Sequence, residues 1–275
     1  MYLKKFRHLL ILGFAAVFVA GCQNMERPAL DPNYPTDDNQ VLLPGDLRFY
    51  IGFNKTDGPS PRWNALDSIS GNPALLFPLS YDAGASGNAV KGADGTAALY
   101  LNANDFKDAT NFSVAFWIKS PPHDGRTEFL FSLVEPNFAW HSSALFLMLE
   151  NQTATSVTMK MGVKDQWLEG NFPKPMFDNN WHHIVYSFNN TAKKMTYYFD
   201  GVEVTGLANN QYNVANPVSF TNVKNLVLGG WNKHANQPGA SDDWIKSFTG
   251  LIDQFRLYNK ALSGSEAQAL FSTRM

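Results

Sequence analysis

The stretch FTGLIDQFRLYNKALSGSEAQALF, residues 248–271, contains the two patterns that decide the fold class. Its first half, residues 251–258, is rich in branched and aromatic side chains, which predicts a β-strand. Ser263 and Glu266 follow with the spacing of a capping box, in which each side chain accepts a hydrogen bond from the other residue's backbone N–H. We therefore expect one short C-terminal helix that packs its apolar side onto a sheet.

Strand patterns recur at short spacing through the rest of the chain. Apolar side chains alternate with other side chains in residues 112–118, 157–163 and 184–188, which is typical of strands with one buried face. Asp200-Gly201 separates two β-rich runs and favours a hairpin, because a type I′ turn needs positive φ at both central residues. Many short strands with almost no helix predict an all-β fold, a sandwich of two antiparallel sheets.

The composition narrows the classes of function. The chain has 275 residues, of which 44% are hydrophobic and 17% charged, so it is too apolar to be disordered. The formal net charge is −2, which leaves no basic excess to neutralise a phosphate backbone, and nucleic acid is not an expected partner. Residues 47–275 show no break in composition and no internal repeat, so we expect a single domain.

The N-terminus has the pattern of an export signal. Basic residues precede an apolar run over residues 9–20, which is too short to span a bilayer. The tetrapeptide at residues 19–22, Val-Ala-Gly-Cys, resembles a bacterial lipobox. That resemblance implies removal of residues 1–21 and acylation of Cys22, the only cysteine in the chain. The alternative is an ordinary cleaved signal that leaves Cys22 as a free thiol.

Residues 22–46 are predicted to form a flexible linker, because prolines interrupt them and no hydrophobic period survives. Together with the lipobox, this linker predicts an outer membrane lipoprotein, periplasmic or surface-exposed. Its lipid would be the only attachment to the membrane.

Three segments together resemble a known family. They are FSVAFWIK at 112–119, WHHIVY at 181–186 with YFDG at 198–201, and the strand and capped helix within 248–271. Their order and spacing are similar to those of the bacterial laminin-G-like, concanavalin-A-like jelly-roll family, over residues 47–272. The resemblance implies a two-sheet jelly roll, carbohydrate binding in many members, and a structural calcium ion in some.

The resemblance also suggests where to look for catalysis. Family 16 glycoside hydrolases share this fold and carry Glu-x-Asp-x-x-Glu, or the same motif with one spacer fewer, on a single strand that faces the substrate groove. This sequence contains no such run, and its glutamates are scattered singly. We therefore expect a non-catalytic protein, with a hydrolase or lyase that uses unfamiliar residues as a remaining alternative.

A calcium site is the metal hypothesis that the resemblance supports. Asp253 stands where family members often carry a ligand, whereas the matching early position holds Asn54 instead of aspartate. Calcium prefers several oxygen ligands, so a neutral amide at residue 54 should weaken the site. The alternative is that Asp253 is a surface residue that hydrogen-bonds the neighbouring strand.

Glycan contacts are expected from exposed tryptophans beside planar polar side chains, because sugars stack on aromatic rings. The richest stretch is a long loop after residue 230, and long loops in compact domains are often functional. We expect Trp231 and Trp244 to flank a groove with polar residues at its rim. The candidate glycan-binding residues are Trp140, Trp167, Trp231, Asn232, His234, Asp242, Asp243 and Trp244.

These observations favour a lipid-anchored, non-catalytic module that captures oligo- or polysaccharides at the bacterial envelope. The resemblance leaves open a protein-binding adhesion or complex subunit with envelope protein partners. Exposed aromatics in one groove would favour glycan, whereas a flat apolar patch would favour a protein partner.

Overall fold

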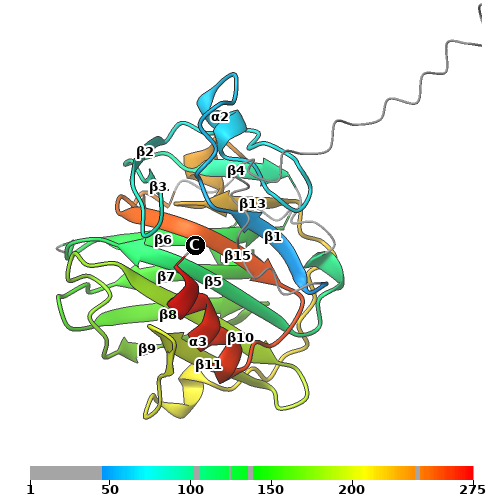
Figure 1. Cartoon of the computed structure of the whole chain (residues 1–275). Helices are drawn as coiled ribbons and strands as arrows, with labels where there is room; N and C mark the ends of the chain where they lie inside the picture. Colours follow the sequence, from blue (N-terminus) through cyan, green and yellow to red (C-terminus); the bar gives the residue numbers. More distant parts are fainter. Residues whose placement is uncertain (1–44, 102–105, 124, 136–138, 239–241, 275) are drawn as a thin grey trace, which may run out of the picture. The chain divides into compact units, whose positions relative to one another are not determined.

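Two β-sheets form a sandwich, as the sequence predicts (Figure 1). This computed structural model describes residues 45–101, 106–123, 125–135, 139–238 and 242–274. Neighbouring strands pair antiparallel, except that β14 (Ile245–Ser247) runs parallel to β6 (Thr127–Val134). The predicted signal peptide, Cys22 and nearly all of the predicted linker lie outside the described residues.

The first sheet has the order β12-β11-β10-β5-β15-β3-β2, with β1 beside β15. The turn between β11 and β12 has φ values of 50° at Asp200 and 78° at Gly201, which confirms the predicted hairpin. The strands are β1 (Leu47–Ile51), β2 (Ser80–Ala83), β3 (Asn88–Lys91), β5 (Phe112–Lys119), β10 (His182–Asn189), β11 (Lys194–Phe199), β12 (Val202–Glu203) and β15 (Leu251–Tyr258).

The second sheet has the order β4-β13-β6-β7-β8-β9, with β14 beside β6. The stretch after residue 230, which the sequence predicts to be a long loop, contains the short strand β14, so this part of the prediction was wrong. The remaining strands are β4 (Ala98–Leu101), β7 (Leu145–Glu150), β8 (Val157–Val163), β9 (Gln166–Phe172) and β13 (Asn225–Leu228).

The C-terminal helix α3 (Gly264–Thr273) begins at the predicted capping box. The Ser263 hydroxyl accepts from the Glu266 amide at 3.4 Å, and the Glu266 carboxylate accepts from the Ser263 amide at 2.9 Å. Figure 1 shows α3 across the first sheet, where its Ala267 and Leu270 join a buried cluster with side chains of β5, β10 and β11. The helix therefore covers one outer face of the sandwich.

The other helical segments are short: α2 (Pro61–Asn64), η1 (Phe106–Asp108), η2 (Trp140–Ser142), η3 (Asn209–Gln211) and η4 (Asn232–Ala235). No helix within the described ranges is long and apolar enough to cross a membrane.

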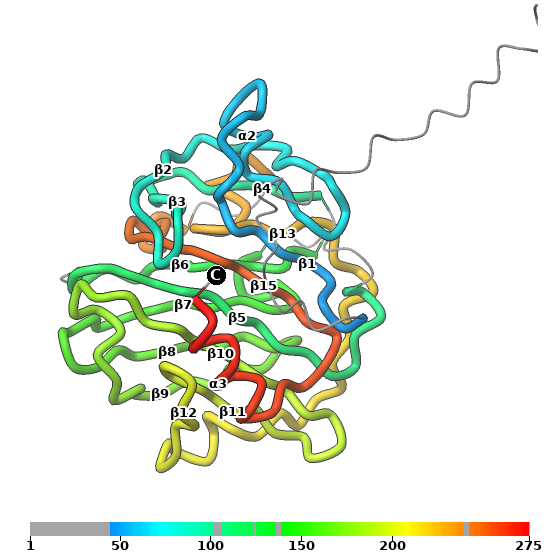
Figure 2. The backbone as a smooth tube through the Cα atoms, viewed as in Figure 1, coloured from blue at the N-terminus to red at the C-terminus, as the bar shows by residue number. Residues whose placement is uncertain are grey.

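The main core lies between the two sheets, whose layered paths are traced in Figure 2. The alternation of side chains along each strand decides which of them face this core. Leu145, Leu147 and Leu149 of β7 belong to the main core, whereas Phe146 and Met148 alternate with them and belong to a different cluster. The outer face of the second sheet therefore carries apolar side chains of its own.

Candidate functional site

Three tryptophans from separate parts of the chain meet on the outer face of the second sheet. The rings of Trp140 and Trp167 stack with centroids 5.4 Å apart, and Trp244 stands at 87° to Trp140 with centroids 5.6 Å apart. Trp167 and Trp244 are 45% and 49% exposed, so broad ring surfaces reach solvent. We call Trp140, Trp167 and Trp244 the tryptophan platform.

A buried apolar layer supports this platform. It consists of Phe129, Phe146, Met148, Trp231 and Ile245, with Trp140 packed against it. The layer holds Trp140 in place, because the Trp140 ring contacts the rings of Phe129 and Phe146 edge to face, at centroid distances of 6.3 and 5.8 Å. The platform therefore rests on strands rather than on a loop alone, and its central ring is held in place.

Trp231 does not flank a groove, contrary to our prediction for the long loop. Its ring is only 1% exposed, so it is part of the supporting layer and not the exposed wall of a groove. The chain leaves β13 at Gly229, which adopts φ +83°, and folds back over the outer face of the sheet. Burial of this large ring under the loop removes more apolar surface from water than exposure would.

Charged side chains border the platform, and the sequence reasoning missed them. Lys160 lies 5.3 Å from the Trp167 ring centroid and 5.9 Å from that of Trp140. Its ammonium is also 3.9 Å from Glu150 and 3.5 Å from Glu169. The alternation of side chains in β8 could have revealed Lys160, because it places this residue on the sheet face opposite to Met159 and Met161, which belong to the core.

The polar candidates of the loop are divided between the interior and the surface. Asn232 is 1% exposed and donates to the Pro238 carbonyl at 3.2 Å, so it stabilises the loop itself. Asp242 is half-buried, and its carbonyl accepts from the Ile245 amide at 3.1 Å. Only Asp243 is fully exposed, and its ion pair with Lys233 holds the pKa of its carboxyl below the usual range.

A cavity of about 320 Å³ adjoins the platform, since Ile245 belongs both to its lining and to the supporting layer. His234 and Asp243 line it together with Asp94, Lys233 and Lys246. Burial lowers the pKa of His234 to about 4, so this imidazole is neutral at pH 7. The structure thus brings two predicted residues to one charged cavity beside the aromatic rings.

Comparison with known proteins defines the family. A family model described as concanavalin A-like lectin/glucanases superfamily (Laminin_G_3) matches residues 92–268, more than half of the chain. The chain belongs to this superfamily. A search of curated proteins found no match.

Solved structures similar to this concanavalin A-like domain come from several kinds of protein. Domain 4 of AbnA, a GH43 arabinanase from Geobacillus stearothermophilus in complex with arabinotriose, aligns with a TM-score of 0.50 at 20% identity, covering 82% of this chain and 98% of that one. Trypanosoma rangeli sialidase aligns at 0.59 and 15% identity, covering 90% of this chain and 36% of the sialidase. The binding domain of botulinum neurotoxin serotype D/C aligns at 0.55 and 14%, covering 84% and 52%. At sequence identities this low, the structural similarity shows a shared fold alone.

The calcium implied by the fold family does not fit the residues present. Asn54 Oδ1 already accepts from the Asn88 amide at 2.7 Å, and Asp253 Oδ2 accepts from the Ser86 amide at 3.2 Å. Asp253 is fully buried, not a surface residue, and burial raises its pKa to about 7. Only its Oδ1 lacks a partner, and the described residues contain no group of three acidic, His or Cys ligands. Calcium needs six to eight oxygen ligands.

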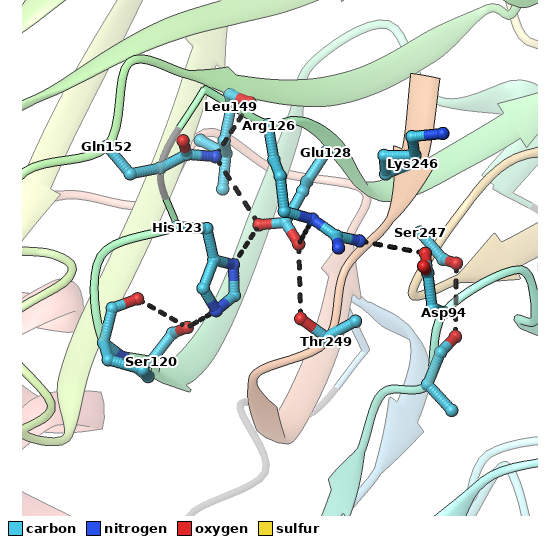
Figure 3. Close-up of polar contacts among 12 residues, drawn as sticks. Asp94, Ser120, His123, Arg126, Glu128, Leu149, Gln152, Lys246, Ser247 and Thr249 are labelled. Atoms are coloured by element: carbon cyan, nitrogen blue, oxygen red, sulfur yellow. Dashed lines mark hydrogen bonds and ion pairs between the residues drawn. The ribbon is translucent and has the colours of Figure 1, made fainter. Parts of the chain in front are cut away.

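A second polar cluster of the domain has the connectivity of a hydrolytic triad (Figure 3). Ser120 Oγ lies 3.1 Å from His123 Nε2, and His123 Nδ1 lies 2.7 Å from Glu128 Oε2. However, Ser120 is 1% exposed, and Pro121 after it has no N–H to stabilise an oxyanion. We therefore interpret the cluster as structural, with buried Glu128 as its centre.

Proposed function

We propose that the protein is a non-catalytic, lipid-anchored carbohydrate-binding module whose glycan-binding surface is the tryptophan platform. The observation that carries the proposal is the meeting of Trp140, Trp167 and Trp244 on the outer face of the second sheet. Sugar rings present apolar CH faces that stack on such rings. The arabinotriose complex of the similarly folded arabinanase domain is consistent with this chemistry.

The arrangement suggests how a glycan would lie. Trp167, whose ring is 45% exposed, would support a sugar face, while Trp244, perpendicular to Trp140, would form a side wall. Lys160 and Glu169 stand within reach of sugar hydroxyls at one border. The cavity lined by Lys233, Asp243 and their neighbours offers polar partners at the other.

Replacement of Trp167 by alanine should weaken oligosaccharide binding at least tenfold, because a stacking ring contributes about 1.5–3 kcal/mol. The ligand for calorimetry is the strongest neutral binder from a glycan array that includes arabinotriose. Trp63→Ala is the matched control, because Trp63 is 37% exposed on α2, which lies near β4, at the opposite edge of the second sheet from β9. Equal affinity of wild type and Trp167→Ala would refute the platform as the binding surface.

The anchoring part of the proposal rests on the lipobox pattern at residues 19–22. Cys22→Ser removes the thiol that would be acylated, so the protein should lose its membrane association, or keep its signal peptide. Membrane fractionation and intact mass of the mature protein measure both outcomes. Unchanged fractionation together with unchanged mature mass would contradict lipidation.

A glycan hydrolase is the second candidate, because Glu150 and Glu169 lie 3.9 and 3.5 Å from the same Lys160 ammonium. Their separation is therefore compatible with the roughly 5–10 Å between catalytic carboxylates in glycosidases. Incubation of the bound oligosaccharide with the protein decides between the two. A binding module releases no new reducing ends, whereas a hydrolase releases them and loses this activity in Glu150→Gln or Glu169→Gln.

A further inference from the structure

Large apolar side chains gather on the surface at the end of the domain that carries α2 and the edge strand β4. Trp63, Ile69, Leu75 and Leu101 are 37%, 39%, 47% and 59% exposed, and they are four of the seven large hydrophobic side chains that the described residues expose. Leu75 and Leu101 line one cavity with Arg62, which lies beside the Trp63 ring, and Ile69 is next in the chain to another lining residue. We call these four side chains the apolar patch. Apolar side chains that gather in this way mark an interaction surface.

The backbone holds the apolar patch outward through hydrogen bonds. The Asp67 carboxylate, which is 2% exposed, accepts from the Ile69 amide at 3.1 Å and from the Ser70 hydroxyl at 2.6 Å. The Leu75 amide donates to the Leu99 carbonyl of β4 at 2.8 Å. Ile69 and Leu75 therefore face solvent from a braced turn and from the border of a sheet.

The chemistry and shape of the apolar patch fit a lipid surface. The Arg62 guanidinium lies 5.5 Å from the Trp63 ring centroid, and tryptophan and arginine beside aliphatic side chains are typical of segments that lie in the membrane interface. Figure 1 shows α2 at one extremity of the domain. The exposed leucines surround a cavity of about 280 Å³, so the surface is uneven, whereas a flat patch would favour a protein partner.

The predicted linker brings this end of the domain within reach of a membrane. Residues 22–46 lead directly into β1, whose Phe49 lines the same cavity. A flexible chain of about 25 residues has a root-mean-square end-to-end distance of about 25–30 Å, and β1 adds about 17 Å. Contact between a tethered domain and its own membrane is effectively intramolecular, so a weakly binding apolar surface suffices.

We propose that the apolar patch docks on the membrane to which the protein is anchored. Trp63 would lie among the lipid headgroups, and the aliphatic side chains would enter the boundary of the acyl chains. Because β4 and β9 are opposite edges of the second sheet, docking would turn Trp167 on β9 away from the bilayer, where glycan is accessible. This inference rests on the lipid anchor of the proposed function.

The test uses full-length acylated protein, verified by intact mass, in vesicles of phosphatidylethanolamine and phosphatidylglycerol. Cys22 is the only cysteine and would be acylated, so an introduced cysteine can carry an environment-sensitive fluorophore alone. In Leu101→Cys we expect blue-shifted emission and quenching by lipids with brominated acyl chains. Val202→Cys is the matched control, because Val202 is 63% exposed on β12 in the other sheet, and it should show neither effect.

A second substitution tests the apolar contact itself. Leu75→Asp should weaken the quenching of the fluorophore at residue 101 severalfold and leave the melting temperature nearly unchanged, because Leu75 is already exposed. Equal quenching at residues 101 and 202, or unchanged quenching in Leu75→Asp, would overturn docking while leaving the anchor intact. Blue-shifted emission at residue 101 without vesicles would also overturn docking, because another part of the chain or a second copy would then cover the apolar patch. An unacylated mature protein would overturn the anchor and this inference together.

Discussion

Replacement of Trp231 by alanine is expected to lower the free energy of unfolding by about 3–5 kcal/mol, the range for removal of a large buried aromatic side chain. The ring is 1% exposed and packs in one cluster with Phe129, Phe146, Met148 and Ile245. A cavity in this layer would also remove support from Trp140, which packs on it. Chemical denaturation followed by circular dichroism measures the loss.

Trp244→Ala is the matched control for this prediction, because Trp244 lies in the same connection but is 49% exposed. Its removal should cost less than about 1 kcal/mol of stability and should instead weaken glycan binding. If Trp231→Ala unfolds at the same denaturant concentration as wild type but loses glycan binding, the ring contacts ligand. The interpretation of Trp231 as a supporting residue would then be wrong.

Removal of the Glu128 carboxylate is the second change with a large expected effect. Glu128 is fully buried, and its oxygens lie 2.7 Å from His123 Nδ1 and 3.4 Å from Arg126 Nε (Figure 3). Thr249 also donates to it at 3.4 Å, so residues next to β6 and β15 meet at this carboxylate. Glu128→Ala should cost about 3 kcal/mol, at the low end for a broken buried pair because His123 and Arg126 retain contact with water.

Glu150→Ala provides the comparison, since Glu150 pairs with Lys160 at a partly exposed site. The pair is long, at 3.9 Å, and Lys160 keeps Glu169 as a second partner at 3.5 Å, so the unfolding midpoint of Glu150→Ala should fall less than that of Glu128→Ala. Thermal and denaturant unfolding of both variants measure the two losses of stability. An unchanged midpoint for Glu128→Ala would show that the buried cluster contributes nothing to stability.

The Glu128 cluster also has a connection to the candidate site. Arg126, which faces Glu128, donates to Asp94 at 2.9 Å, and Asp94 lines the charged cavity beside the platform. Arg126 therefore links Glu128 to Asp94, which forms part of the wall of that cavity. We expect glycan affinity in Glu128→Ala to fall only if this wall helps to bind the glycan.

Local sequence determined the secondary structure well. The alternation at 157–163, the Asp200-Gly201 turn and the Ser263–Glu266 capping box all formed as predicted, because each depends on residues close together in the chain. The all-β class and the two-sheet sandwich followed from the recurrence of such patterns. The short strands near the N-terminal part of the domain, such as β2 and β4, had no clear pattern of their own.

Composition also selected most of the candidate aromatic residues, but it could not say which rings would be exposed. Trp231 and Trp244 belong to the same loop and have the same chemistry, yet one is 1% and the other 49% exposed. Only the tertiary structure decided this, because the loop folds back over apolar side chains that β6 and β7 present on the outer face of the sheet. Trp140 and Trp167 stack because β7, β8 and β9 pair in one sheet, and strand pairing joins positions that the sequence keeps apart.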